Sequence, residues 1–276
     1  MQLAIWTAAL LAALLVLRLR WFRTAPRTGP SWPLRSEPTI LGFALAFVAM
    51  MIGAWLAATL LPGTQGSDFA RATAQGLGAQ LGTVAALGLV WMAPGARVRG
   101  GPSAVAAGGV HRHPCGRMEA LLLTVAVVGL LWVIGGGLGT IIGAVQAWLG
   151  APPPAIGHET LRALATGEIP PVWKWTAIAT AVVVAPVAEE CLYRGYLQQG
   201  LKSAGLGLGW SVVATATLFA GIHWGALPEG SRATGLATLW VLGAGWGMLY
   251  ERTGRIGASV LAHAAFNAIN LAMLAK

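Results

Sequence analysis

Long apolar runs divide this sequence and restrict the folds that are open to it. Several approach or exceed the ~18–20 residues that a helix needs to cross the hydrocarbon of a bilayer. The sequence therefore predicts an all-α protein, a polytopic transmembrane helical bundle with about eight spans. The expected spans are 3–17, 40–61, 75–92, 118–149, 173–188, 210–224, 234–250 and 256–274.

The amount and placement of charge also argue against a soluble protein. Charged residues make up 10% of the chain, whereas ordinary globular domains contain about 25%. The net charge of +9 comes from basic residues that flank the apolar runs, which indicates membrane topology and contact with anionic lipid. No dense basic tract is interleaved with aromatic residues, so the pattern does not favour nucleic-acid binding.

The basic residues also predict an orientation. With the N-terminus outside, 13 of the 18 basic residues fall on one side, which the positive-inside rule assigns to the cytoplasm. The first run has no basic residues before it and is expected to be a retained helix rather than a cleavable signal. Cys115 and Cys191 both fall on the cytoplasmic side, where a disulfide is not expected. Abundant alanine, glycine and arginine suggest a bacterial source, so the expected location is the inner (cytoplasmic) membrane.

Two adjacent acidic residues, Glu189 and Glu190, follow the apolar run 173–188. Ionisable groups at membrane depth are costly and are candidates for function. Glu190 and Arg194 are four apart and share a helical face, whereas Glu189 lies about 100° away from Glu190. Pro186 is expected to distort the helix because it has no N–H to donate to the Val182 carbonyl. Either one carboxylate pairs with Arg194 while the other faces a cavity, or both belong to an interfacial ion-pair cluster.

A second polar group, His223, closes the apolar stretch that contains Phe219. A lone histidine there is commonly structural. If residues 203–208 form the turn between two helices, however, Glu190 and His223 lie 16 and 17 residues from its centre at residue 206. An antiparallel hairpin would place them at nearly the same depth, provided that its helices extend beyond the apolar runs into the cytoplasm.

A third polar pair, His263 and Asn267, lies inside the last predicted span. The two residues are four apart and share a helical face, which has to meet protein or water rather than lipid. A hydrogen bond between packed helices would account for the pair alone. Together with Glu189 and His223, the pair suggests activation of a water molecule, with or without a metal. Two histidines and one carboxylate form a known zinc ligand set, and an amide with a histidine suits an oxyanion.

These motifs resemble the CPBP family of intramembrane proteases, also called the CAAX prenyl endopeptidase type II, lysostaphin-resistance-like or Abi family. The family pattern is Glu-Glu-x-x-x-Arg, Phe-x-x-x-His and His-x-x-x-Asn. The resemblance covers about residues 118–276 as a protease core, and residues 1–117 form N-terminal transmembrane helices without a recognised motif. The matching residues, in the same order, are Glu189, Glu190, Arg194, Phe219, His223, His263 and Asn267.

The resemblance implies an endopeptidase that acts on a membrane-associated or prenylated protein or peptide near the cytoplasmic side. It implies that Glu189 is the general base, helped by His223, and that His263 and Asn267 hold the oxyanion. Glu190 is expected to complete the catalytic set, with Arg194 and Phe219 in support.

The sequence leaves several matters open. Whether the attacking water is held on zinc by Glu189, His223 and His263 is not decided by the motifs, and neither are the substrate and the oligomeric state. The alternatives to an endopeptidase are a non-enzymatic membrane partner or immunity protein of the same fold, and a proton-coupled transporter that uses the same polar residues as a relay.

Overall fold

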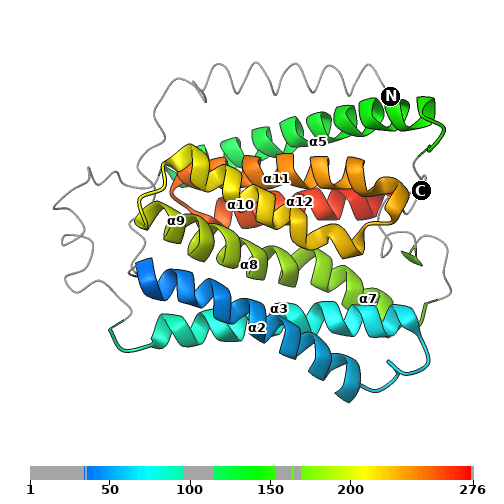
Figure 1. The fold of residues 1–276 in the computed structure, drawn as a ribbon, viewed down its shortest axis with the longest axis horizontal. Coiled ribbons are helices and arrows are strands. Elements are labelled where there is room, and N and C mark those ends of the chain that lie inside the picture. Colours follow the sequence, from blue (N-terminus) through cyan, green and yellow to red (C-terminus); the bar gives the residue numbers. More distant parts are fainter. Residues whose placement is uncertain (1–33, 35, 96–114, 153–162, 165–168, 275–276) are drawn as a thin grey trace. The chain divides into compact units, whose positions relative to one another are not determined.

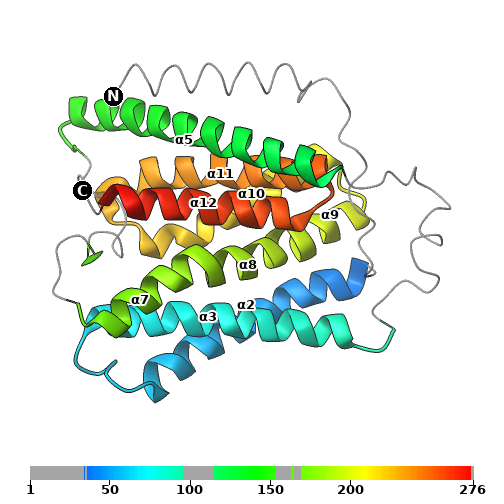
Figure 2. The same ribbon diagram turned by 180° about the vertical axis from the view of Figure 1, so that it is seen from behind.

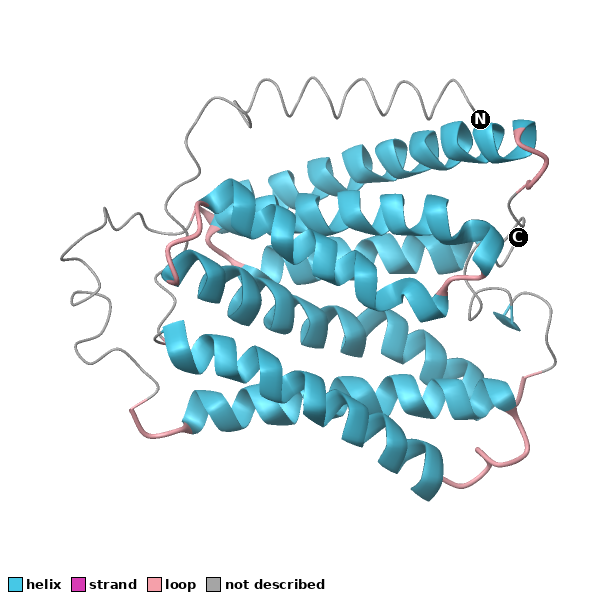
Figure 3. Ribbon diagram, in the orientation of Figure 1, coloured by secondary structure: helices cyan, strands magenta, loops and turns pink. Residues whose placement is uncertain are grey.

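The computed structural model describes residues 34, 36–95, 115–152, 163–164 and 169–274, and Figure 3 shows that this part of the chain is built from helices. No strand occurs among these residues, which confirms the all-α prediction. The predicted first span and most basic residues near the N-terminus lie outside the described residues. The sequence also suggests a short interfacial helix at 159–166, after the fourth span and three prolines, and all but two of its residues lie outside the described part as well.

A helix is found at each predicted span within the described part of the chain (Figure 1). Four helical stretches there are long and apolar enough to cross a membrane: Glu37–Leu60, Arg117–Trp148, Pro171–Ser203 and Ile256–Met273. The total of eight spans stays a prediction. The helices are α2 (Ser36–Leu60), α3 (Asp68–Met92), α5 (Arg117–Trp148), α7 (Pro171–Ala179), α8 (Ala185–Glu190), α9 (Gln199–Ser203), α10 (Leu208–Ile222), α11 (Arg232–Thr253) and α12 (Ile256–Leu274).

The helix after Pro171 is longer than its apolar run. It continues through π-helical segments to Ser203 and reaches fifteen residues beyond the predicted end at 188. The first of the two helices in the hairpin hypothesis therefore extends beyond its apolar run, and its entry into the cytoplasm stays a prediction. A turn follows, with Gly205 at φ 95°, before α10 begins at Leu208. This agrees with the turn predicted at 203–208.

The chain divides into two compact units, each assembled from distant segments. The first unit contains Arg112–Ala165 and Val212–Phe266, and the second contains Ser31–His111, Thr166–Ser211 and Asn267–Lys276. These two units differ from the division into N-terminal helices, 1–117, and a protease core, 118–276, which stays a prediction.

In the first unit, α5 packs along α11 through small residues (Figures 1 and 2). The sequence repeats glycine every four residues at Gly135, Gly139 and Gly143, a spacing that predicts close helix packing. A Cβ atom at Gly135 would lie 3.3 Å from Thr238, and one at Gly139 would lie 3.6 Å from Thr234. The packing role predicted for the stripe is confirmed at these two positions.

In the second unit, α2 crosses α3 at glycine residues, which let the two backbones approach closely (Figures 1 and 2). A Cβ atom at Gly53 would collide with the Gly78 carbonyl, and one at Gly82 would collide with the Ala49 carbonyl. The Tyr196 hydroxyl donates to the Leu87 carbonyl of α3 at 2.7 Å. The helix that carries the paired glutamates is therefore attached to α3 within this unit.

Candidate active site

The helix around the two glutamates departs from α-helical geometry on both sides. Thr180–Val184 and Cys191–Gln198 are π-helical, and they flank the six residues of α8. The N–H of Ala185 donates five residues back, to the Thr180 carbonyl. Pro186 comes next and has no N–H, so it cannot continue either register. The distortion predicted from Pro186 is present, and π-helical turns are frequent at functional sites.

The side-chain amide of Asn267 bonds to the helix at this distortion. In the π register, the donor for the Ala181 carbonyl would be the N–H of residue 186, which proline lacks. The Asn267 Nδ2–H donates to that carbonyl at 2.8 Å instead. The contact joins α12 to the helix of the glutamates within the second unit. It uses one of the two N–H groups of the amide.

Glu190 is paired with Arg194, as the spacing of four predicted. Glu190 Oε1 lies 3.0 Å from Arg194 Nη1, and both side chains have 0% exposure. A buried pair of opposite charges depends on the presence of both partners, because either one alone would leave a charge without compensation. The pair is therefore a structural element next to Glu189.

Glu189 has a different environment. Its side chain is half-buried, and its Oε1 accepts a hydrogen bond from Gln80 Nε2 of α3 at 2.9 Å. A carboxylate has about four lone-pair sites, and this bond occupies one of them. The two adjacent glutamates thus have separate partners, as the angle of about 100° between them predicts.

Sequence reasoning missed Gln80. The signal was present, because Gln80 is an amide five residues inside the predicted span 75–92, where it has to face protein or water rather than lipid.

In the first unit, His223 is held by the residue four positions before it. His223 Nδ1 lies 2.7 Å from the Phe219 carbonyl oxygen. A carbonyl only accepts, so Nδ1 carries the proton and neutral His223 presents Nε2 as the basic nitrogen. Helix α10 ends at Ile222, and its last four carbonyls lack α-helical donors. The Phe-x-x-x-His spacing therefore fixes the tautomer of the histidine.

Phe219 also brings the two predicted histidines of this unit together. Its ring centroid lies 4.9 Å from that of His223 and 6.1 Å from that of His263. Trp246 stacks on His263 at 4.0 Å with an interplanar angle of 17°, and Phe219 meets Trp246 edge-on at 5.8 Å. The buried His263 ring is therefore held between two aromatic residues.

Trp246 was not among the predicted site residues. Tryptophans near the ends of predicted spans are interfacial anchors by pattern, but Trp246 lies in the interior of the span 234–250. Trp240 lies inside the same span, so the sequence carries no signal that separates the two, and only burial distinguishes Trp246 from Trp240. Its carbonyl also accepts from the Ser259 hydroxyl at 2.9 Å, which links α11 to α12.

We expect Trp246→Leu to reduce kcat for peptide cleavage about ten- to a hundredfold while leaving KM nearly unchanged, because a small displacement of a reacting group has effects of that size. Trp246→Phe, which retains an aromatic face, should recover most of the rate. Trp240→Leu, on the same helix but exposed, is the matched control. Steady-state kinetics with thermal unfolding of each variant would check this. A parallel loss of rate and folded protein in Trp246→Leu would mean that the tryptophan acts on stability alone.

The two units hold different parts of the predicted set. The first holds Phe219, His223 and His263 on one aromatic cluster, and the second holds Glu189, Glu190, Arg194 and Asn267. The meeting of the glutamates with the histidines stays a prediction.

No group of three His, Cys, Asp or Glu side chains in the described part of the chain is arranged to hold a metal. Neither unit alone contains the suggested zinc set, because Glu189 belongs to one unit and the two histidines belong to the other. The zinc set of Glu189, His223 and His263 therefore stays a prediction. Cys115 and Cys191 do not form a disulfide with each other.

A comparison with protein-family models matched residues 171–269 to the family described as Rce1-like, type II CAAX prenyl endopeptidase Rce1-like. The matched segment contains all seven residues of the three motifs, and it confirms the resemblance inferred from them. Neither the search of curated proteins nor the search of solved structures gave a match.

Proposed function

We propose that this integral membrane protein is an intramembrane endopeptidase, because residues 171–269 match the family model of Rce1-like type II CAAX prenyl endopeptidases. It hydrolyses a peptide bond of a membrane-associated protein or peptide with a water molecule activated by Glu189 and His223. The observation that supports this most directly is the separation of the two glutamates. Glu190 is paired with Arg194 in the interior, whereas half-buried Glu189 accepts from a neutral amide.

Glu189 is the general base. Arg194 lies 3.0 Å from Glu190, and Gln80 is a neutral donor that orients the Glu189 carboxylate. Glu189 takes a proton from the water while the water oxygen attacks the carbonyl carbon of the substrate. The proton is then delivered to the amide nitrogen as the C–N bond breaks, which gives a carboxylate and an amine.

His223 assists through Nε2. The bond from Nδ1 to the Phe219 carbonyl keeps Nε2 unprotonated in the neutral ring. Nε2 accepts a hydrogen bond from the attacking water and holds it in position while Glu189 takes the other proton of the water. The ring contacts of Phe219 limit the reorientation of His223 during this transfer.

His263 and Asn267 stabilise the oxyanion of the tetrahedral intermediate. Both are hydrogen-bond donors on one face of α12, and preorganised donors are among the largest contributions to such reactions. The contacts that support this are the Trp246 stack on His263 and the bond from one Asn267 N–H to the Ala181 carbonyl. The second N–H of Asn267 is the one assigned to the oxyanion.

The substrate class follows from the setting. Peptide hydrolysis needs water, which hydrocarbon excludes, so the polar residues serve as a hydrated site for a segment that is itself membrane-bound. A C-terminal CAAX-like segment carrying a prenyl group fits the family description. Unprenylated membrane peptides fit the same chemistry, and the predicted orientation places the site towards the cytoplasm.

The test is cleavage by the purified full-length protein in detergent or nanodiscs. The substrates are fluorogenic membrane peptides, including a farnesylated CAAX peptide and its unfarnesylated form, with products identified by mass spectrometry. We expect one new amine terminus per cleaved bond. A strong zinc chelator in parallel reactions measures whether a metal holds the water. Proton-dependent flux in proteoliposomes without cleavage of any peptide would favour the transporter, and binding without turnover would favour the non-enzymatic partner.

A further inference from the structure

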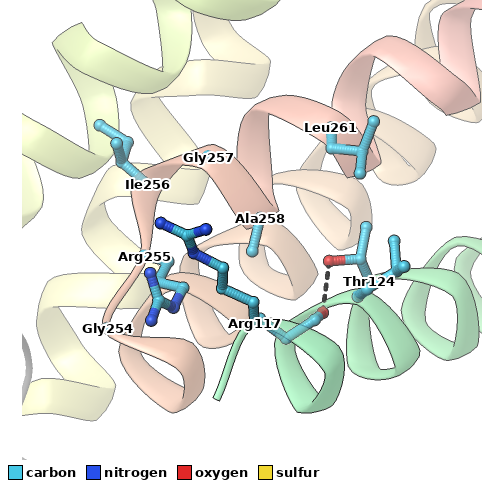
Figure 4. Close-up of a pocket in the computed structure, with 10 residues that line it drawn as sticks. Arg117, Thr124, Gly254, Arg255, Ile256, Gly257, Ala258 and Leu261 are labelled. Carbon is cyan, nitrogen blue, oxygen red and sulfur yellow. Dashed lines mark hydrogen bonds between the residues drawn. The ribbon is translucent and has the colours of Figure 1, made fainter. Parts of the chain in front are cut away.

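A cavity of about 530 Å³ lies in the first unit, where α5 and α12 both begin (Figure 4). Its walls come from the first turns of the two helices and from the turn that precedes α12. The volume is within the range of roughly 300–1,000 Å³ that is common for small-ligand sites. None of its lining residues belongs to the proposed catalytic set.

Two arginines, Arg117 and Arg255, line this cavity, and none of its lining residues is acidic. Two like charges around one cavity repel each other unless an anion lies between them. Thr124 adds no competing polar group, because its hydroxyl donates to the Ala120 carbonyl at 2.8 Å, the dashed line in Figure 4. The cavity is thus suited to an anion, and guanidinium groups form bidentate pairs with phosphate.

Arg255 is held in place by its own segment and by the residue before α5. Its Nε–H donates to the Cys115 carbonyl at 2.9 Å, and its backbone N–H donates to Thr253 Oγ1 at 3.2 Å. The Cys115 N–H donates back to the Thr253 carbonyl at 3.1 Å. Gly254 between them adopts φ 65°, a left-handed conformation that glycine accepts without strain. The Cys115 bond uses only Nε, so the two terminal nitrogens of the guanidinium keep their geometry for a ligand.

The helix starts reinforce the preference for an anion. Helix α5 begins at Arg117 with no side-chain cap on its N-terminus, and α12 begins at Ile256. The first N–H groups of a helix and its dipole both favour negative charge. This contribution adds to that of the two arginines.

Apolar side chains lie one turn further along each helix. Leu121 and Leu261 line the cavity, and 45% and 47% of their surfaces are exposed. Both helices are candidate membrane spans, so these leucines follow the arginines in the direction of the hydrocarbon. Cations at the helix starts followed by exposed leucines match the order of a phospholipid, in which the phosphate precedes the acyl chains.

We infer that this cavity binds an anionic phospholipid, with its phosphate between Arg117 and Arg255 and an acyl chain along Leu121 and Leu261. A soluble anion would pair with the two arginines but would leave Leu121 and Leu261 exposed to water.

Native mass spectrometry of the detergent-purified full-length protein tests this inference. Phosphatidylglycerol and phosphatidylcholine with identical acyl chains are added in turn, and the fraction of protein that retains each lipid is measured. We expect phosphatidylglycerol to be retained in preference to phosphatidylcholine. Arg117→Gln should lower its retention about tenfold or more, since a charge-assisted contact to phosphate is lost. Arg71→Gln removes the same charge from an exposed position on α3 and should change nothing.

A second variant removes the space and keeps both charges. A Cβ atom at Gly257 would meet nothing within 4 Å, so Gly257→Leu fills the cavity without displacing its neighbours. It should lower phosphatidylglycerol retention as Arg117→Gln does. Gly137→Leu, at an equally open position on α5 outside the cavity, is the control.

Four results would overturn the inference. The first is equal retention of the two lipids, and the second is undiminished retention in both Arg117→Gln and Gly257→Leu. The third is displacement of the lipid by inorganic phosphate alone. The fourth is displacement by a peptide with a free C-terminal carboxylate but not by the same peptide with an amidated C-terminus. Displacement by the peptide carboxylate would mean that the cavity binds the C-terminus of the substrate rather than a lipid.

Discussion

Glu189→Gln is expected to abolish peptide cleavage while the protein remains folded. Glutamine has nearly the same shape and can still accept the hydrogen bond from Gln80, but it cannot take a proton from water. The loss of a general base lowers rates by roughly 10²–10⁴, so kcat should fall to the background of the assay. Glu189→Ala should give the same loss. The measurement is turnover of the best substrate by purified variants that have matching thermal unfolding temperatures.

Glu229→Gln is the matched control for Glu189→Gln. Glu229 is an exposed carboxylate in the same chain, and its neutralisation should leave turnover unchanged. Normal cleavage by Glu189→Gln would disprove the assignment of the base, and it would also weaken the protease proposal unless another acidic residue, Glu190 first, proved essential.

Arg194→Met is expected to cause the largest loss of stability. The arginine and its partner Glu190 have 0% exposure and lie 3.0 Å apart. Removal of one member would leave a buried charge without compensation, which costs about 3–5 kcal/mol in the free energy of unfolding. Denaturant unfolding in detergent, followed by circular dichroism, would measure the change. Replacement of both residues with leucine should recover a large part of it, because neither charge of this pair then remains buried.

Arg71→Gln serves as the control for Arg194→Met, because Arg71 is exposed on α3. Its effect should lie within about 0.5 kcal/mol. An equally small effect of Arg194→Met would mean that the pair does not stabilise the fold. The double leucine variant also separates stability from catalysis. If it folds but does not cleave, Glu190 or Arg194 acts in the reaction as well as in the structure.

Local spacing was sufficient for contacts that lie within one helix or across one turn. The pairing of Glu190 with Arg194 follows from helical periodicity, and so does the bond from His223 to the Phe219 carbonyl, although the carbonyl partner itself was not anticipated. The helix that extends past its apolar run was predicted from the positions of Glu190 and His223 around the expected turn. In each case the backbone geometry of a few residues determines the contact.

Contacts between distant segments could not be predicted in this way. Gln80 bonds to Glu189 across 109 residues of sequence, and Asn267 bonds to Ala181 across 86. The stack of Trp246 on His263 likewise requires two helices to pack at one depth. No period in the sequence encodes these distances, because they depend on how far one helix slides and rotates against another.

The sequence by itself determined the helices, the three motifs and their family, because apolar length, helical periodicity and residue identity are local properties. Only the tertiary structure decided that Asn267 bonds to the Ala181 carbonyl next to the Pro186 distortion. It also decided which aromatic rings contact His263, and that Arg117 and Arg255 line one cavity. The physical reason is that side-chain packing between helices selects one relative position among many that hydrophobic patterning alone allows.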